Sequence, residues 1–389
     1  MSHERRARRA GYHRSLAPGL IGVIAFVVVL LCGVLIGLGI TAFKGSDQAK
    51  SAASSVVQSP VAKHPAAQSG GAVPSVASFP SAASTGFTKA PGYPGKLADC
   101  SSLIVKSNTT YRFCNFPDGL FVGSVTQHPV NVTFIGCRFA SNSVVSADVA
   151  DYGRNITFSY STFEPSTVAV GSEPVSPRAR PVSAAASYQY AVDLRYDGGF
   201  TIDHSDIWGF GDGIQFSNSS KADPVVIENS WIHNPSLDPT GQAHVDAILN
   251  SYGGISYMTF NHNTIVGNGN TQALGLQGSS AYKHVTITNN YFSGYGYTIC
   301  VGIRVLSTDI VFTGNVLASA LEPTYGPIYS SESFSTPGLG NVWRDNKFYV
   351  VPGTSWLAAK NSGLYWWPTD TNPSNSGQVI GHATDYPGA

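Results

Sequence analysis

The chain is poor in charged residues, which make up 12% of its 389 positions, and it contains only two methionines and five cysteines. It has no Lys-, Glu- or Leu-rich helical pattern, no phosphate-binding loop, no Cys/His zinc pattern and no nucleophilic-serine motif. These absences argue against a helical protein and against the enzyme classes that those motifs define. Glycine, serine, threonine and asparagine are abundant instead, which is typical of a β protein with many turns.

The two ends of the chain differ in charge. Residues 1–95 carry nine Lys or Arg and two Asp or Glu, a net charge of +7, whereas residues 96–389 carry 14 against 21, a net charge of −7. An acidic C-terminal part is a poor partner for nucleic acid, so we expect none.

An uncharged stretch, LIGVIAFVVVLLCGVLIGLGITAF, runs from Leu20 to Phe43. It is long enough to cross a bilayer as a helix, and five arginines lie before it in residues 1–19. We predict a basic cytoplasmic tail (1–19), an uncleaved transmembrane signal anchor (20–43) and a single-pass cell-membrane protein whose remainder is extracellular. A cleaved signal peptide is the alternative.

Residues 44–95 are rich in Ala, Ser and Pro, and we predict a disordered linker there. The β domain is then expected at 96–350, followed by a C-terminal cap or tail at 351–389. In an exported domain Cys100 and Cys114, which enclose a short loop, could form a disulfide. Cys137 and Cys300 are predicted to be small buried residues.

One short unit recurs along the chain at spacings of mostly 24–33 residues. Clear copies are VNVTFIGCRF (130–139), SYMTFNHNTI (256–265) and KHVTITNNYF (283–292). Three positions at fixed offsets align in eight copies. They are a Thr or Val (Thr133, Thr157, Thr201, Val226, Thr259, Thr286, Val311, Val342), a small or amide residue (Cys137, Ser161, Ser205, Ser230, Asn263, Asn290, Asn315, Asn346) and an apolar residue (Phe139, Phe163, Ile207, Ile232, Ile265, Phe292, Leu317, Phe348). Such a repeat indicates a solenoid.

Each unit contains two short strands joined by a bend, and a third strand fits further along. The third strands are expected at AVDLRY (191–196), DGIQF (212–216), DAILN (246–250), QALGLQ (272–277) and VGIRV (301–305). The repeated bend has no Asn-Gly dipeptide, which agrees with parallel rather than hairpin pairing. We predict an all-β protein, a right-handed single-stranded parallel β-helix with three strands per coil and about eight or more coils.

The amide column at the bend has a direct physical interpretation. Asparagine tolerates left-handed backbone angles, and side chains of successive coils about 4.8 Å apart can hydrogen-bond as a ladder. In this respect residues 100–350 resemble the pectate-lyase-like parallel β-helix superfamily, whose members carry asparagine ladders at this bend. The resemblance implies a substrate groove along the face made by the third strands listed above and their loops.

Candidate chemistry lies on that face. When the third strands are aligned on Ile214 and Ile248, Asp212 and Asp246 fall in one column. Gln272 and Val301 would continue this column. His244 lies two residues before Asp246 and should project to the same side of the chain. Two carboxylates and an imidazole could form a general acid–base pair for glycoside cleavage. The same carboxylates could instead bind Ca²⁺ for β-elimination from a uronate polymer, with Arg304 as base or carboxylate clamp. Alternatively, both Asp side chains point inward and only bond loop amides.

The segments GDGI, AHVDAI and GIRV are loosely similar to the catalytic elements of polygalacturonases. The paired-Asp and Gly-His-Gly signatures of that family are absent, and Arg304 is not followed by Ile-Lys. No cofactor other than possible Ca²⁺ is expected. Trp208 and Tyr252 could stack on pyranose rings, and with Gln215 and Gln277 they are the predicted substrate-binding residues.

Two functions therefore remain open. The first is an extracytoplasmic, membrane-tethered enzyme, a glycoside hydrolase or polysaccharide lyase, that acts on polysaccharide or cell-surface glycan. The second is a non-catalytic β-helix that binds glycan or a protein partner. Asp212, His244 and Asp246 meeting in an open groove would favour the enzyme, and inward-facing Asp side chains bonded to loop amides would favour the binding protein.

Overall fold

The computed structural model describes residues 78–124, 126–141, 147–151, 153–166, 190–236, 244–250, 256–301, 306–318, 321, 326–329 and 336–349. The chain divides into two compact units, residues 1–69 and 70–389, and all described residues belong to the second. The predicted tail, anchor and C-terminal cap lie outside the described residues. Among the residues that are described, none forms a helix long and apolar enough to cross a membrane.

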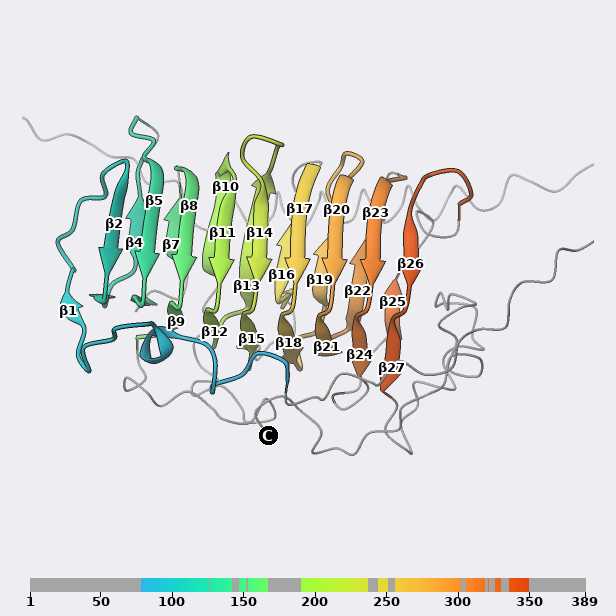
Figure 1. Ribbon diagram of the computed structural model, residues 1–389, viewed down its shortest axis with the longest axis horizontal. Helices are drawn as coiled ribbons and strands as arrows, with labels where there is room; N and C mark the ends of the chain where they lie inside the picture. Colours follow the sequence, from blue (N-terminus) through green and yellow to red (C-terminus); the bar gives the residue numbers. More distant parts are fainter. Residues whose placement is uncertain are drawn as a thin grey trace, which may run out of the picture. The chain divides into compact units, whose positions relative to one another are not determined.

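Three parallel sheets contain the described strands (Figure 1). Sheet A has ten, namely β1 (Ala98–Asp99), β3 (Cys114–Phe116), β6 (Arg138–Ser141), β9 (Thr162–Pro165), β12 (Asp206–Trp208), β15 (Trp231–His233), β18 (Thr264–Gly267), β21 (Tyr291–Gly294), β24 (Val316–Ala318) and β27 (Lys347–Tyr349). Sheet B has nine, namely β2 (Thr109–Arg112), β5 (Val130–Ile135), β8 (Arg154–Ser159), β11 (Phe200–Asp203), β14 (Val225–Glu228), β17 (Ser256–Asn261), β20 (Lys283–Thr288), β23 (Thr308–Thr313) and β26 (Val342–Arg344). Sheet C has eight, namely β4 (Leu120–Val122), β7 (Ala147–Asp151), β10 (Tyr190–Gly198), β13 (Asp212–Asn218), β16 (Ile248–Asn250), β19 (Gln272–Leu276), β22 (Tyr297–Val301) and β25 (Gly326–Tyr329).

Each coil of the chain contributes one strand to sheet B, then one to sheet A, then one to sheet C, and the next coil stacks on it in parallel. The predicted parallel β-helix with three strands per coil is confirmed. The pairing register also confirms two of the aligned columns. The Thr/Val column runs through the partners of sheet B, from Thr133 opposite Thr157 to Val311 opposite Val342. The apolar column runs through sheet A, from Phe139 opposite Phe163 to Leu317 opposite Phe348.

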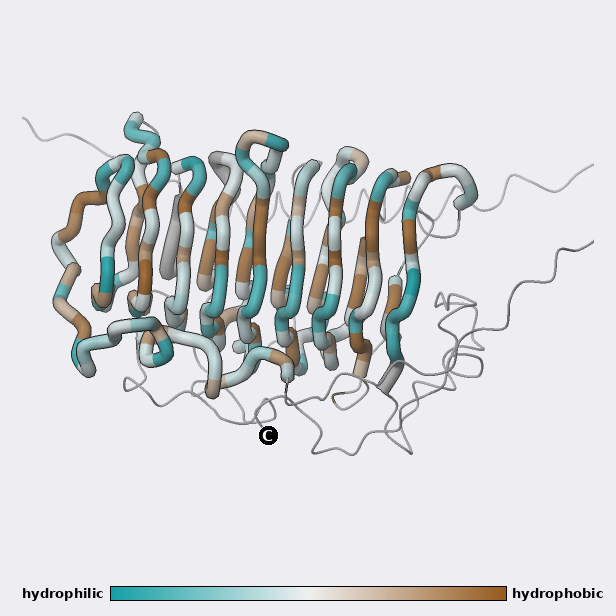
Figure 2. Tube along the Cα trace, viewed as in Figure 1, coloured by the Kyte–Doolittle hydropathy of each residue, from teal (hydrophilic) through white to brown (hydrophobic). Residues whose placement is uncertain are grey.

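The core consists of side chains that point inward from all three sheets. In a typical sheet-B strand such as β20, residues alternate between buried and half-buried, so that Val285 and Ile287 point inward while Thr286 faces outward. Like residues stack along the axis, as Phe139 does on Phe163 with ring centroids 4.9 Å apart. Apolar segments therefore recur at the same level from coil to coil (Figure 2).

The bend between each sheet-B strand and the following sheet-A strand, called here the B–A bend, uses two residues with different roles. The first has a positive φ, as in Asn289 (55°) or His262 (55°), and turns the chain. The second, Asn290 or Asn263 in these coils, points into the interior and is fully buried. From the sequence we predicted that one asparagine both adopts the left-handed backbone conformation and forms the ladder. In the structure two adjacent residues divide these roles.

The inward residues form the predicted ladder. Asn290 Oδ1 accepts hydrogen bonds from the main-chain N–H and from Nδ2 of Asn263, both at 2.9 Å, and Asn315 serves Asn290 in the same way. Asn290 Nδ2 also donates to the Phe260 carbonyl at 3.1 Å. In the earlier coils a serine hydroxyl accepts the main-chain N–H alone, as Ser230 Oγ does from Ser205 at 3.1 Å. The ladder satisfies buried polar groups that water cannot reach.

Residues 78–95, which the sequence placed in the disordered linker, instead pack along the B–A bend, and we call them the strap. The strap contains the short 3₁₀ helix η2 (Phe87–Lys89) and crosses several coils (Figure 1). Phe79 and Phe87 are buried, with the Phe79 ring 5.5 Å from that of Tyr291. Gly86 N–H donates to the His204 carbonyl at 3.0 Å. The mostly small and polar composition of the segment concealed these two aromatic anchors.

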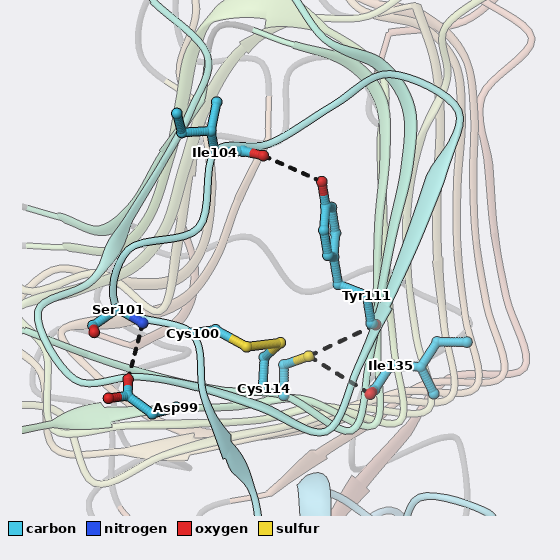
Figure 3. The surroundings of a disulfide bond; sticks show 8 residues. Asp99, Cys100, Ser101, Ile104, Tyr111, Cys114 and Ile135 are labelled. Atoms are coloured by element: carbon cyan, nitrogen blue, oxygen red, sulfur yellow. Dashed lines mark hydrogen bonds between the residues drawn. A yellow bond between two sulfur atoms is a disulfide. The ribbon is translucent and has the colours of Figure 1, made fainter.

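The strap leads into the first coils, where Cys100 and Cys114 form the predicted disulfide, with their Cα atoms 5.5 Å apart (Figure 3). Tyr111 closes the same loop by donating from its hydroxyl to the Ile104 carbonyl. Cys137 and Cys300 are buried free cysteines, as predicted.

The ladder makes a test of the fold possible. Asn290→Ala removes the acceptor of two donors of Asn263, so we expect the free energy of unfolding to fall by about 2–4 kcal/mol. Asn290→Ser is the matched comparison, because serine holds the same column in other coils and keeps one acceptor, and it should lose less. Urea denaturation followed by circular dichroism measures both, and equal losses would contradict the role assigned to the ladder.

Candidate functional site

The predicted catalytic carboxylates lie in one column but inside the β-helix. Asp246 N–H donates to Asp212 Oδ1 at 3.0 Å, and Gln272 N–H donates to Asp246 Oδ1 at 2.7 Å. Both Asp side chains are buried. They therefore accept main-chain N–H groups from the next coil, as the asparagines do at the B–A bend, and this is the inward-facing alternative raised by the sequence.

The register contradicts the predicted continuation of this column from Gln272 to Val301. Gln272 pairs with Tyr297, whereas Val301 pairs with Leu276, so the sheet-C strand is Tyr297–Val301 rather than the expected 301–305. Both segments alternate apolar residues, and the structure uses Ile299 and Val301 as the inward pair. Arg304 itself lies outside the described residues, as does Tyr252.

Two of the predicted substrate-binding residues are buried, Trp208 in sheet A and Gln215 in sheet C. Trp208 and Gln215 are only 1% and 3% exposed, so neither predicted substrate-binding side chain offers a surface to a ligand. Gln277 Nε2 donates to Gln272 Oε1 at 2.6 Å. Trp208 and Gln215 therefore do not line an open groove as predicted.

Asp246 nevertheless has an unusual environment. Its Oδ2 is buried without a hydrogen-bond partner among the described residues, in a small pocket that Trp208, His233 and Tyr295 also line. Burial raises the pKa of Asp246 to about 6, opposed by hydrogen bonds from Thr271 and Gln272 and by the charge of His244. His244 is exposed while Asp246 is buried, so the two do not share a side of the chain as predicted, because residues 244–247 are not in a strand.

Glycines make room for this buried corner. A Cβ at Gly269 would lie 2.4 Å from the Tyr295 ring and 2.5 Å from the Val245 carbonyl oxygen. The Tyr295 side chain reaches past this position toward the Asp column, and its pKa is raised by burial and by Asp246 and Asp212. The corner is therefore a filled part of the core.

A second pair of carboxylates lies on the outside, at the end of sheet B. Asp203 and Glu228 are opposite each other on the adjacent strands β11 and β14, and both point outward, half-buried. Asp203 Oδ1 bonds His204 Nδ1 at 2.6 Å and accepts from Asn229 Nδ2 at 2.9 Å. Asp203 Oδ2 has one longer bond, from Ser159 Oγ at 3.4 Å.

Glu228 has no such partners. Among the described residues no hydrogen bond or ion pair involves its side chain. Burial, then the charge of Asp203, raises the pKa of Glu228, and His204 opposes them. Two neighbouring carboxylates thus sit in contrasting environments, which is the usual arrangement of an acid–base pair.

A groove runs beside this pair. His204, Asn229 and His262 of successive B–A bends form one wall, and the strap forms the other with Ser78, Phe79, Pro80, Ser81, Ala83 and Ser84. It encloses about 430 Å³, including solvent at its mouth. Figure 1 shows the strap crossing these coils. We call this feature the ridge groove.

Hydrogen bonds connect the two walls. His262 Nδ1 bonds Asn229 Oδ1 at 2.8 Å, and His262 Nε2 bonds the Ser78 carbonyl at 3.0 Å. Asn229 Nδ2 in turn donates to Asp203 Oδ1 at 2.9 Å, so one chain of hydrogen bonds connects the strap, His262, Asn229 and Asp203. The Tyr160 ring stacks on His204, one of the groove-lining residues, with ring centroids 4.5 Å apart.

The sequence contains a signal for this site in the two positions before the ladder column, which was not used in the prediction. The two positions before the ladder column read Ser159-Tyr160, Asp203-His204, Glu228-Asn229, Asn261-His262 and Thr288-Asn289. Acidic, imidazole and aromatic side chains thus gather in consecutive coils of one aligned column. Without the strap, however, nothing in the sequence shows that a groove lies there.

Comparison with family models is consistent with this architecture. The model described as "Right handed beta helix region" matches residues 96–292 and 190–323, and together the matches cover more than half of the chain. The chain belongs to the right-handed β-helix family. Comparison with curated proteins and with solved structures gives no match. Among the described residues of this β-helix, no group of three or more His, Cys, Asp or Glu could hold a metal ion.

The buried Asp246 makes stability depend on pH. Its pKa in the folded protein, about 6, lies above the ordinary value of 3.8, so folding favours the protonated form. Stability from this group is complete below about pH 4 and is lost as pH rises to about 6, with a total change of about 3 kcal/mol. We expect Asp246→Asn to be more stable than the native protein at pH 7.5 and to show a flatter dependence between pH 4 and 7.

Urea denaturation across that pH range measures the effect. Asp223→Asn is the control, because it removes a partly exposed carboxylate that pairs with Arg154 on the surface. A pH dependence unchanged by Asp246→Asn would contradict the assignment.

Proposed function

We propose that this β-helix binds carbohydrate in the ridge groove. The observation that carries the proposal is the groove itself, which combines hydroxyl, amide and imidazole groups with the flat Tyr160–His204 stack. Sugar hydroxyls need both donors and acceptors, and pyranose faces pack on flat rings. The donors and acceptors are supplied by Ser81, Ser84, Asn229 and the two histidines of the groove. The flat surface is supplied by the Tyr160–His204 stack.

The direction of the groove suits an extended chain. His204, Asn229 and His262 come from three successive coils, so equivalent polar positions repeat about every 4.8 Å along the axis. A polysaccharide lying along the axis would meet one such position after another. This repetition favours a glycan over a single small molecule.

The charge of the site indicates a neutral glycan. None of the groove-lining residues is Lys or Arg, and Asp203 and Glu228 directly precede the groove-lining His204 and Asn229. A uronate polymer would bring its carboxylates against this pair. Calcium-dependent elimination from a uronate is therefore not the reaction that we propose, and the carboxylates of Asp212 and Asp246 are assigned to the core.

The proposed location follows from the N-terminal segment. We propose that residues 20–43 anchor the chain in the cell membrane and that the β-helix lies outside, where polysaccharides and surface glycans occur.

Binding can be tested with the full-length chain in detergent against a panel of neutral and uronate oligosaccharides by isothermal titration calorimetry. We expect a neutral oligosaccharide to bind and Tyr160→Ala to weaken it about 10-fold, because the stack is worth roughly 1–1.5 kcal/mol.

Tyr257→Ala is the matched control, since Tyr257 stacks on His284 at the same 4.5 Å but at the opposite end of the sheet-B strands. Binding of uronates alone, or equal losses in the two variants, would contradict the proposed site.

A further inference from the structure

Two carboxyl groups, those of Asp203 and Glu228, lie next to the ridge groove, and carbohydrate binding alone does not require them. Asp203 and Glu228 stand on adjacent parallel strands, so their Cα atoms are about 4.8 Å apart and their side chains leave the sheet in the same direction. Both are half-buried beside the groove, and the side chain of Asp203 is 24% exposed. A glycosidic bond lying over the two coils would have one carboxyl group on each side of its reacting carbon.

The two carboxyl groups have different hydrogen-bonding environments. Asp203 Oδ1 bonds His204 Nδ1 and accepts a hydrogen bond from Asn229 Nδ2, so its carboxylate is held in one orientation and Oδ2 keeps only the long Ser159 bond. Glu228 has no hydrogen-bond donor to stabilise a negative charge and stands next to the charge of Asp203. The pKa of Glu228 is therefore raised above its ordinary value, with His204 opposing the shift.

We propose that the ridge groove hydrolyses glycosidic bonds with retention of configuration, Glu228 acting as the acid and Asp203 as the nucleophile. This inference rests on the proposed carbohydrate binding. Adjacent-strand spacing keeps the carboxyl groups close, as retaining enzymes require, and leaves little room for the water that an inverting enzyme places between sugar and base.

In the first step Asp203 Oδ2 attacks the anomeric carbon while the bond to the glycosidic oxygen breaks. That oxygen keeps the electron pair and takes the proton of Glu228, so the leaving sugar departs as an alcohol and a glycosyl ester forms on Asp203. In the second step Glu228, now a carboxylate, takes a proton from water as the water oxygen attacks the same carbon. The ester bond breaks, Asp203 regains its charge and Glu228 its proton.

His204 and Asn229 are positioning residues in this scheme. They hold Asp203 Oδ1, so that Oδ2 faces the sugar, and His262 holds Asn229 in turn. Tyr160, which follows β8 one coil before Asp203 and stacks on His204, would carry the neighbouring sugar ring.

The experiment uses the full-length chain and the neutral oligosaccharide that binds best. Reducing-end release measures hydrolysis, and proton NMR at early times identifies the first anomer of the product. We expect release with retained configuration. Glu228→Gln should lower the rate by about 10²–10⁴-fold while changing the dissociation constant less than twofold, because the amide keeps the shape but has no proton to donate.

Asp309→Asn is the matched control. Asp309 is also an outward carboxylate bonded to a histidine, His284, but at the other end of the sheet-B strands, so its variant should keep full activity. Melting temperatures of both variants near that of the native protein show that any loss is chemical. Should Glu228→Gln unfold, Asp203→Asn supplies the same comparison.

The outcomes separate the two proposals. Binding without hydrolysis, product of inverted configuration, or equal rates for Glu228→Gln and the native protein would overturn the catalytic assignment and leave carbohydrate binding intact. Failure of every glycan to bind would overturn both.

Discussion

The stacking register between coils is the constraint on which the rest of this structure depends, and the buried ladder of the B–A bend enforces it. Asn290 and Asn315 each accept, through Oδ1, both the main-chain N–H and the side-chain N–H of the asparagine in the coil before. A slip by one residue would leave these groups buried and unpaired, and would move every inward side chain of the coil to the outside. The ladder thus selects one alignment among many that the small, repetitive residues of the bend would otherwise allow.

The register decides what each acidic residue can do. Asp212 and Asp246 fall on inward positions, so their carboxylates serve as rungs for the main-chain N–H groups of neighbouring coils. Asp203 and Glu228 fall on outward positions two residues before the ladder and remain available to a ligand. An acidic residue is therefore buried in the core or accessible to a ligand depending on whether its position in the coil points inward or outward. The strap lies against the outward residues of the bends, and a groove forms between them.

Fixed offsets explain what could be predicted from the sequence. Eight bends with the same spacing determined the sheet-A and sheet-B columns, and the short Cys100–Cys114 loop indicated the disulfide. Sheet C was harder, because the connections that lead into it vary in length. The alignment of Ile214 with Ile248 was correct, but extending it along the sequence did not predict that β22 begins at Tyr297. The strap could not be predicted, since two phenylalanines in a Ser/Ala/Pro-rich segment carry its contacts.

The ladder joins each coil only to the coils immediately before and after it. Asn290, for example, is bonded to Asn263 on one side and Asn315 on the other, and to no more distant rung. A complete coil with its own rung could therefore be duplicated or deleted without changing the hydrogen bonding between the remaining coils, whereas a single residue inserted at the B–A bend would shift the rung out of the ladder. Modular growth of this kind would lengthen the outward column of the B–A bends by one polar position for each added coil, so the length of the surface beside the strap depends on the number of coils.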